Sequence, residues 1–472
     1  DAGRGTARAP GYRPRPGSAL MRGLDTATIG IVGVCLLIVF VVIGVRVFVA
    51  AALTGFLGLL ALRNWDVAGA IAGTIPHSKA VTYPLSVLPL FILIGFLAFH
   101  AGLTSRLFEA ARRWFGWVPG GLAVATVFAA AGFAAVSGAS TATAAVFSRV
   151  AIPDMMRNAY DRRLTAGVIA AGGTLASLIP PSAILVVYAI IVEESVGRLL
   201  LAGFLPGIVS ALIYAGLIIG MCRIRPGLGR PITGFTWRQR FQSLPGTLPI
   251  FLVIGVIFGA LYTGAATPTE AGALGAMVVF CFYVIRAYRE RALREMGGRL
   301  RTALMETAKL TVMIFTLIWG VFLFVRFLGF AGLPSVFADW VVTLDMPPIL
   351  IMICILLAYA VLGMFMDAIG MLVLTLPVVF PAVVALGYDP IWFGIIVVKM
   401  AEICLITPPI GLNCFVVAGV SRELRDSEGR SLAIPLQDVF RGIGPFFVAD
   451  LLTVAVLLAF PGIVLWLPRT MG

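Results

Sequence analysis

Hydroxyl-bearing residues and glycines gather in one stretch of an otherwise apolar sequence. Residues 137–145 read SGASTATAA, and residues 172–182 read GGTLASLIPPS. The glycines and prolines in these runs interrupt helices. Hydrocarbon cannot satisfy the N–H and C=O groups that a break exposes, so breaks persist only where protein buries them or where they line a polar cavity. The stretch therefore predicts a binding site made of backbone and hydroxyl groups.

A second pair of motifs repeats this arrangement. GMFMDAIG begins at Gly363, and LITPPIGLN ends at Asn413. Gly132 and Pro180 are 48 residues apart, and Gly363 and Pro408 are 45 residues apart. This agreement indicates an internal duplication, because differences of about three residues are typical of loops.

The composition indicates a polytopic membrane protein. Of the 472 residues, 60% are hydrophobic and 12% are charged, and about a dozen apolar runs approach the roughly 20 residues that span a bilayer. The net charge of +13 comes from Arg-rich loops, which is typical of positive-inside topology and excludes a nucleic-acid module.

Several kinds of chemistry are excluded. The six cysteines have no CxxC spacing, and His77 and His100 are too few for a histidine-built metal site or a haem. The acidic residues in apolar segments are too scattered for an intramembrane enzyme. The chain lacks GxxxxGK[ST], so uptake would draw its energy from an ion gradient.

The charges around the two predicted tips have opposite signs. Arginines flank the first tip, whereas only acidic residues flank the second. These residues are Arg112, Arg113, Arg157, Arg162 and Arg163, and Asp339, Asp345 and Asp389. By the positive-inside rule, the first hairpin enters and leaves from the cytoplasm and the second from outside. Two halves of opposite sidedness form an inverted repeat, an architecture of secondary transporters.

The sequence thus predicts an all-α polytopic fold with two re-entrant helical hairpins and two broken transmembrane helices. A basic disordered tail, the first repeat, a cytoplasmic linker, the second repeat and a C-terminal tail follow in order. Their ranges are 1–23, 24–221, 222–243, 244–467 and 468–472. The hairpins are expected at about 117–157 and 346–387, and the broken helices at about 165–191 and 391–418.

With GVRVFVA at 44–50, these four motifs resemble the large membrane subunit of TRAP (tripartite ATP-independent periplasmic) transporters over residues 25–467. The resemblance implies a sodium-coupled importer of organic acids, often C4-dicarboxylates or sialic acids, that works as an elevator in the bacterial inner membrane. It also implies a small membrane subunit of about four helices and a periplasmic substrate-binding protein. One departure is Arg46, where the family often has proline.

Sodium prefers oxygen ligands, which unwound helices and hydroxyl groups supply, whereas a carboxylate prefers helix N-termini. We expect two sodium sites and no other metal or cofactor. The first would use Ser137, Gly138, Ser140, Gly173 and Thr174, and the second Asp367, Gly370, Thr407 and Pro408. The carboxylate substrate would contact Ser140, Thr141, Thr143, Pro181, Ser182 and Asn413.

Other interpretations remain open at this stage. Small-residue patches also serve helix packing, and Asn413 either contacts substrate or satisfies backbone. Lys399 and Glu402, three residues apart on one helix, are expected to pair with each other or to form a charge relay. The amphipathic stretch from Leu107 to Trp117 is expected to contact membrane lipid. A solo anion carrier of the divalent-anion type and a channel are the rival functions.

Overall fold

A computed structural model describes residues 25–289, 293–364, 366–426 and 428–471 of the chain. The predicted basic tail, residues 1–23, lies outside the described residues. Within the described ranges the secondary structure is helical apart from turns, loops and one isolated bridge between Arg425 and Ser431. The chain is an all-α protein, as the apolar runs predicted.

The helices follow the chain as a series of long and short elements. In the first half they are α1 (Thr26–Val42), α2 (Val47–Leu62), α3 (Trp65–Ala80), η2 (Tyr83–Ser86), α4 (Val87–His100), α5 (Leu103–Phe115), α6 (Gly121–Ser137), α7 (Ser140–Arg157), α8 (Arg162–Leu178), α9 (Ala183–Val192) and α10 (Val196–Ile224). Next come η3 (Pro226–Leu228), α11 (Trp237–Ser243), η4 (Leu244–Gly246), α12 (Leu248–Tyr262), α13 (Pro268–Arg289) and α14 (Leu293–Ala331). The remaining helices are α15 (Leu333–Thr343), α16 (Pro348–Gly363), α17 (Ala368–Ala385), α18 (Pro390–Cys404), α19 (Leu412–Glu423), α20 (Leu436–Ala459) and α21 (Gly462–Arg469).

Seven of the described helices are long and apolar enough to cross a membrane, or eight if the bent pair of α11–η4 and α12 is one span. The sequence suggested about a dozen apolar runs. Several of these form helices of 10–17 residues, including α6 and α16. Glycine and proline breaks shorten them, so an apolar run does not always become one full span.

The predicted hairpins and broken helices correspond to pairs of helices. The first hairpin range holds α6 and α7, and the second holds α16 and α17. The first broken helix consists of α8 and α9, and the second of α18 and α19. The sequence did not predict α3. The last helix, α21, runs through Arg469, so the end of the chain is helical for longer than the expected tail at 468–472 allows.

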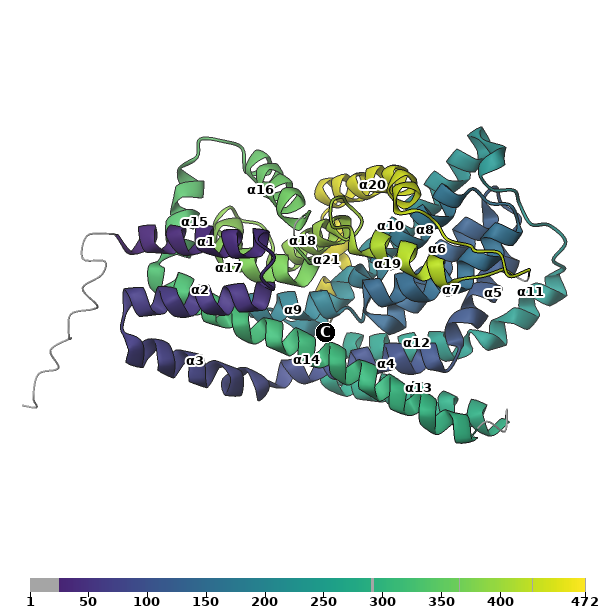
Figure 1. Ribbon diagram of the computed structural model, residues 1–472, viewed down its shortest axis with the longest axis horizontal. Coiled ribbons are helices and arrows are strands. Elements are labelled where there is room, and N and C mark those ends of the chain that lie inside the picture. The colour runs from purple at the N-terminus through teal and green to yellow at the C-terminus, as the bar shows by residue number, and fades with distance from the viewer. Residues whose placement is uncertain (1–24, 290–292, 365, 427, 472) are drawn as a thin grey trace, which may run out of the picture.

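The long helix α14 lies against α1, α2 and α4, and Figure 1 shows it running below the hairpins. Glycines make the contact with α1 and α2 close. A methyl group on Gly33 or Gly58 would lie 2.3 Å from the ring of Phe327. Small residues let helix backbones approach each other in the absence of a strong hydrophobic drive.

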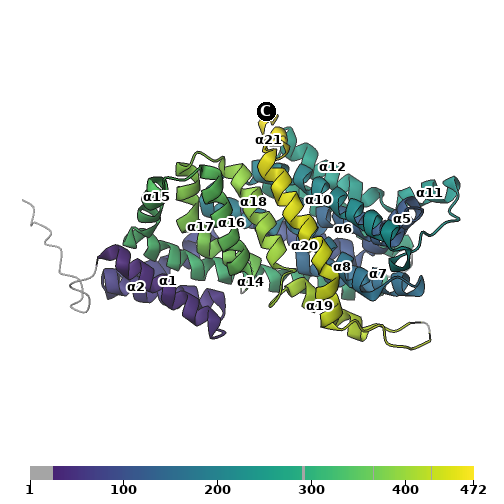
Figure 2. The same ribbon diagram turned by 90° about the horizontal axis from the view of Figure 1, so that it is seen from above.

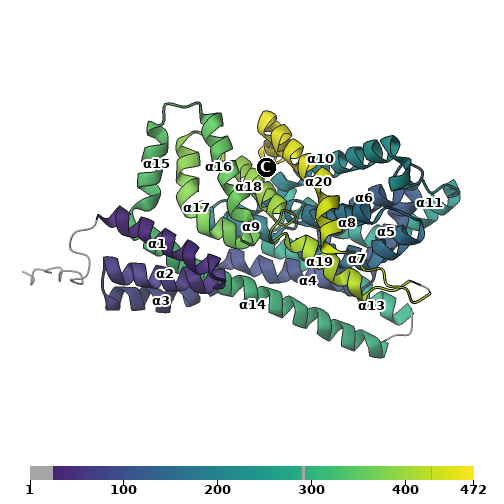
Figure 3. The ribbon, with the colours of Figure 1, turned by 45° about the horizontal axis from the view of Figure 1, so that its top comes forward.

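Helix α8 lies at the centre of the molecule, and every residue from Leu164 to Leu178 is buried. Its packing against α20 is tight, because a methyl group on Gly167 would lie 2.3 Å from the carbonyl oxygen of Gly442. Figure 2 shows α20 between α18 and α8, and Figure 3 shows the two hairpins on opposite sides of α20. The break at the end of α8 is therefore held inside protein.

Candidate functional site

The first tip is a two-residue turn between α6 and α7. Gly138 has a φ of +61°, and Ala139 is extended. The hydroxyl groups of Ser137 and Thr143 lie 2.8 Å apart across the turn. Thr143 donates its single hydroxyl hydrogen to the carbonyl of Ala139 at 2.9 Å, so Ser137 is the donor in the pair. Both hydroxyl side chains are buried.

This tip contacts the first break directly. Ala183, the first residue of α9, donates its N–H to the carbonyl of Gly138 at 3.4 Å. A methyl group on Gly138 would lie 2.4 Å from the carbonyl oxygen of Pro181, so no larger residue fits there. The hydroxyl of Ser182 donates to the carbonyl of Ser177 and accepts from the N–H of Leu185 at 3.3 Å. One backbone hydrogen bond thus joins the turn to the break, and the hydroxyl of Ser182 satisfies two backbone groups within the break.

Asn413, in α19 of the second half of the chain, binds residues of both α7 and α8. Its side-chain nitrogen donates to the hydroxyl of Ser140 at 2.9 Å and to the carbonyl of Ala170 at 3.1 Å. Its own N–H donates to the carbonyl of Leu405 at 3.0 Å. The side chain is fully buried, and its amide oxygen has no hydrogen-bond partner among the described residues. A buried acceptor oxygen without a donor is suited to a cation.

The two predicted site residues of α8, Gly173 and Thr174, face different neighbours. A methyl group on Gly173 would lie 3.1 Å from the carbonyl oxygen of Ser140, so the backbone of α8 does reach the first tip. The hydroxyl of Thr174 instead donates to the carbonyl of Ala171 at 2.7 Å and lies 3.4 Å from the hydroxyl of Tyr214 on α10. The side chain of Thr174 therefore faces away from the tip. Thr141 is exposed.

The second tip and the second break form mostly local bonds. The carboxylate of Asp367 caps α17 by accepting the N–H of Gly370 at 3.0 Å. The hydroxyl of Thr407 donates to the carbonyl of Ile403 at 2.5 Å, and Pro408 is exposed. None of these bonds joins the second tip to the second break.

The contact between the second hairpin and the second broken helix lies farther back. A methyl group on Gly363, the last residue of α16, would overlap the sulfur of Cys404 at the end of α18. The hairpin therefore approaches the helix just before its break. The first tip is sealed against its break, whereas Pro408 and Pro409 at the second are exposed.

The predicted pairing of Lys399 with Glu402 is confirmed, with 2.8 Å between Nζ and Oε2. A third charge joins them, because Asp450 Oδ1 lies 2.7 Å from Nζ. All three side chains are fully buried. Sequence reasoning missed Asp450. Its signal was an acidic residue within the apolar run that forms α20, but no spacing connected it to α18.

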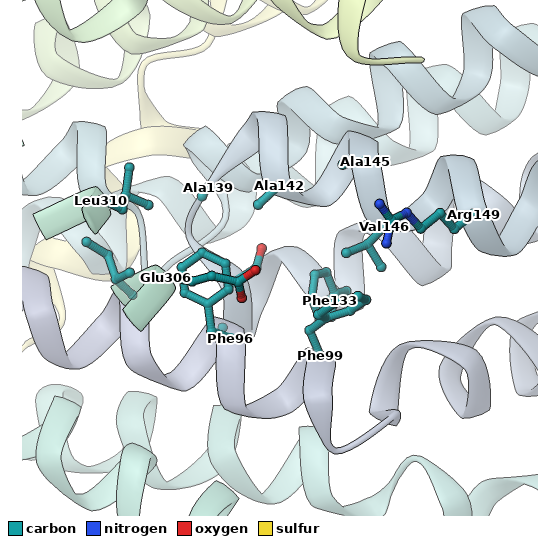
Figure 4. Close-up of a pocket in the computed structure, with 13 residues that line it drawn as sticks. Phe96, Phe99, Phe133, Ala139, Ala142, Ala145, Val146, Arg149, Glu306 and Leu310 are labelled. Carbon is teal, nitrogen blue, oxygen red and sulfur yellow. The ribbon is translucent and has the colours of Figure 1, made fainter. Parts of the chain in front are cut away.

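A cavity of about 160 Å³ lies between α4, the first hairpin and α14. Phe96, Phe99 and Phe133 form part of its wall, and Arg149 stands at one end, as Figure 4 shows. Glu306 of α14 also borders the cavity. An apolar cavity with a few charged groups is typical of a small-molecule site. Arg149 is not among the predicted site residues, because it lies outside the Gly, Ser and Thr motifs that predicted them.

Each of the two charged groups that border the cavity lies next to an ionisable side chain. Glu306 Oε2 lies 2.9 Å from His100 Nε2 of α4. The guanidinium of Arg149 is 3.8 Å from the carboxylate of Glu423, and both side chains are exposed. A surface ion pair of this length contributes little, so the guanidinium can exchange Glu423 for another carboxylate.

Three comparisons with known proteins place these features in context. The family model described as the DctM component of tripartite ATP-independent periplasmic transporters matches residues 34–463. The C4-dicarboxylate TRAP transporter large permease protein DctM of Pseudomonas aeruginosa is 35% identical over 390 residues, 83% of this chain and 87% of that protein. The sialic acid TRAP transporter large permease protein SiaM of Vibrio cholerae is 28% identical over 387 residues, 82% of this chain and 86% of that protein.

A solved structure shares the fold. The crystal structure of the YdaH transporter of Alcanivorax borkumensis superposes with a TM-score of 0.61 over 93% of this chain and 98% of that chain. The two sequences are 14% identical, so the likeness concerns the fold alone.

The bond between Asn413 and Ser140 gives the first prediction. In a double-mutant cycle of Asn413→Ala and Ser140→Ala, the two losses in unfolding free energy should be non-additive by about 0.5–3 kcal/mol, because contacting residues couple. The measurement is chemical unfolding of the purified protein in detergent. As a control, Asn413→Ala combined with Thr141→Ala, which alters an exposed neighbour, should be additive within about 0.5 kcal/mol. Additivity in both cycles would contradict the bridge.

Proposed function

The chain belongs to the DctM-component family of tripartite ATP-independent periplasmic transporters, and from this premise we propose that it imports small organic acids together with sodium ions. As a large TRAP permease it is a multi-pass protein of the bacterial inner membrane and not an enzyme, and the resemblance of its motifs to this family is confirmed. The observation that carries sodium coupling is the buried amide oxygen of Asn413 beside the first tip, which has no hydrogen-bond partner within the described ranges.

The first proposed sodium site lies at the meeting of the first tip, α8 and α19. The side chain of Asn413 binds the hydroxyl of Ser140, a methyl group on Gly173 would lie 3.1 Å from the carbonyl oxygen of Ser140, and Ser137 and Gly138 form the adjoining turn. Hydroxyl, carbonyl and amide oxygens are the donors that hard cations accept. The hydroxyl of Thr174 is left out of the proposal, because it faces α10.

The second proposed sodium site uses Asp367 and Gly370 of the second tip with Thr407 and Pro408 of the second break. The carboxylate of Asp367 supplies a negative charge, and the interrupted α18–α19 helix supplies carbonyl groups. In this conformation the two parts bond locally. Sodium binding would therefore need a small closing movement of the second hairpin.

The proposed substrate is a small carboxylate, the chemistry shared by the C4-dicarboxylates and sialic acids in the names of relatives. The N-terminus of α7 at Ser140 and Thr141 offers free N–H groups and a favourable helix dipole. Thr143, Pro181, Ser182 and Asn413 shape the same tip and break. The adjoining cavity contributes the positive charge of Arg149.

We place the moving part of an elevator in the two hairpins and the two broken helices, arranged as an inverted repeat. The stationary part would comprise α1 to α4, α13 and α14. This division is supported by the cavity, which lies between α4 and α14 on one side and the first tip on the other. The word tripartite in the family description supports two partners, a small four-helix membrane subunit and a periplasmic substrate-binding protein.

Uptake into proteoliposomes tests the proposal. Vesicles that contain this chain and its small-subunit partner should accumulate a radiolabelled dicarboxylate or sugar acid only with an inward sodium gradient and a cognate binding protein. Accumulation with sodium alone would indicate a solo carrier. Flux that is independent of the gradient would indicate a channel, and no uptake of any acid under both conditions would contradict the substrate class.

Sodium should also stabilise the purified chain through the first site. A ligand at a hundredfold excess over its Kd stabilises the folded state by about 2.7 kcal/mol, so sodium should raise the Tm of the wild-type chain more than potassium at equal ionic strength. Asn413→Ala should reduce this difference, whereas Thr141→Ala should retain it. Equal sodium shifts in both variants would remove Asn413 from the site.

Arg149 should determine affinity for the carboxylate. Loss of a charge-assisted hydrogen bond costs about 1.5 kcal/mol or more, roughly a tenfold rise in KM, so Arg149→Gln should raise the KM for the transported acid by at least about tenfold. The control is Arg157→Gln, because Arg157 is exposed on the same helix and does not line the cavity. An unchanged KM for Arg149→Gln would exclude the guanidinium from substrate binding.

A further inference from the structure

A cluster of charged and hydroxyl side chains is enclosed where α8, α10, α18 and α20 meet. Lys399 and Glu402 come from α18, Asp450 from α20, and Ser210 and Tyr214 from α10. All five side chains are buried, with relative exposures of 0%. None of them lines the cavity beside the first tip. None of them is among the residues proposed for the sodium and substrate sites.

The charges of the cluster do not balance if every group is ionised. One ammonium group faces two carboxylates, which leaves one excess negative charge. Tyr214 is the other titratable group in contact, and as a phenol it is neutral. An uncompensated charge is strongly disfavoured in a dry protein interior. Complete burial therefore favours a protonation state in which the net charge of the cluster is zero.

The hydrogen bonds of Lys399 leave part of each carboxylate without a donor. Nζ has three hydrogens, and three acceptors lie within reach: Glu402 Oε2 at 2.8 Å, Asp450 Oδ1 at 2.7 Å and Ser210 Oγ at 2.9 Å. The ammonium group is thereby fully used. Glu402 Oε1 and Asp450 Oδ2 are buried and have no hydrogen-bond partner among the described residues.

The two carboxylates are not equally supported. Asp450 Oδ1 accepts from the hydroxyl of Tyr214 at 2.5 Å as well as facing Lys399. Among the described residues, Lys399 is the one hydrogen-bond donor to the carboxylate of Glu402. Two donors on one oxygen stabilise an ionised carboxylate, and a group with fewer donors is the better place for a neutral acid.

We propose that Glu402 binds one proton, so that the neutral acid stands beside a Lys399–Asp450 ion pair. The ligand is a proton rather than a metal cation, because the atoms around the lysine are already in contact and a proton requires no cavity. With this proton bound, the buried cluster between α8, α10, α18 and α20 has no net charge. Its assignment depends on neither sodium coupling nor the identity of the substrate.

Infrared spectroscopy of the purified full-length chain tests the proposal, since a protonated carboxylic acid has a C=O stretching band that a carboxylate lacks. The difference between wild type and Glu402→Gln at neutral pH should show the loss of one such band per chain. Glu306→Gln, which alters a glutamate 41% exposed beside His100, should leave this band unchanged. A Glu402→Gln spectrum that retains the band would overturn the proposal.

Two further variants, Lys399→Met and Asp450→Asn, test the charge balance by themselves. They apply even where Glu402→Gln does not purify as a folded protein. Lys399→Met removes the only cation, so both carboxylates should be protonated and the acid band should gain the intensity of one further group. Asp450→Asn should remove the band, because Glu402 then ionises to balance the lysine. An acid band unchanged in Lys399→Met or in Asp450→Asn would overturn the assignment.

Discussion

The architecture depends on one constraint, namely that the polar backbone of an interrupted helix must find partners inside an apolar molecule. At the first break these partners come from the chain itself. The tip of the first hairpin supplies the carbonyl of Gly138 to the N–H of Ala183, and Ser182 binds the backbone on both sides of the break. The hairpin and the broken helix therefore form one unit. A site built there is assembled largely from atoms that every amino acid carries.

Asn413 extends this unit across the two halves of the chain. Its amide nitrogen holds the first hairpin and α8 together, and its amide oxygen remains available to a cation. Movement of the second broken helix would therefore alter the hydrogen bonds of Asn413 at the first tip. At this point the two halves are coupled by a pair of buried hydrogen bonds, which are costly to break without replacement.

Charge is distributed differently in the two functional regions. The polar groups of the first tip itself are neutral hydroxyls and amides, and the adjoining aromatic cavity is bordered by one cation, Arg149, and one acidic residue, Glu306. At the meeting of α8, α10, α18 and α20 the groups are ionisable and enclosed. Neutral oxygens can bind and release an ion with little rearrangement, whereas the enclosed charges bind mainly to one another.

The sequence by itself predicted the all-α membrane class, the family and the points at which Gly and Pro interrupt helices, whereas the ranges of the two repeats stay a prediction. Glycine, proline and apolar run length act locally and are visible in one dimension. Only the tertiary structure decided which oxygens meet. Thr174 faces Tyr214 instead of the first tip, Asn413 joins Ser140 and Ala170, and Asp450 reaches Lys399 from another helix. These contacts depend on how helices that are distant in sequence rotate and pack against each other. The spacing of residues along one helix does not specify this packing.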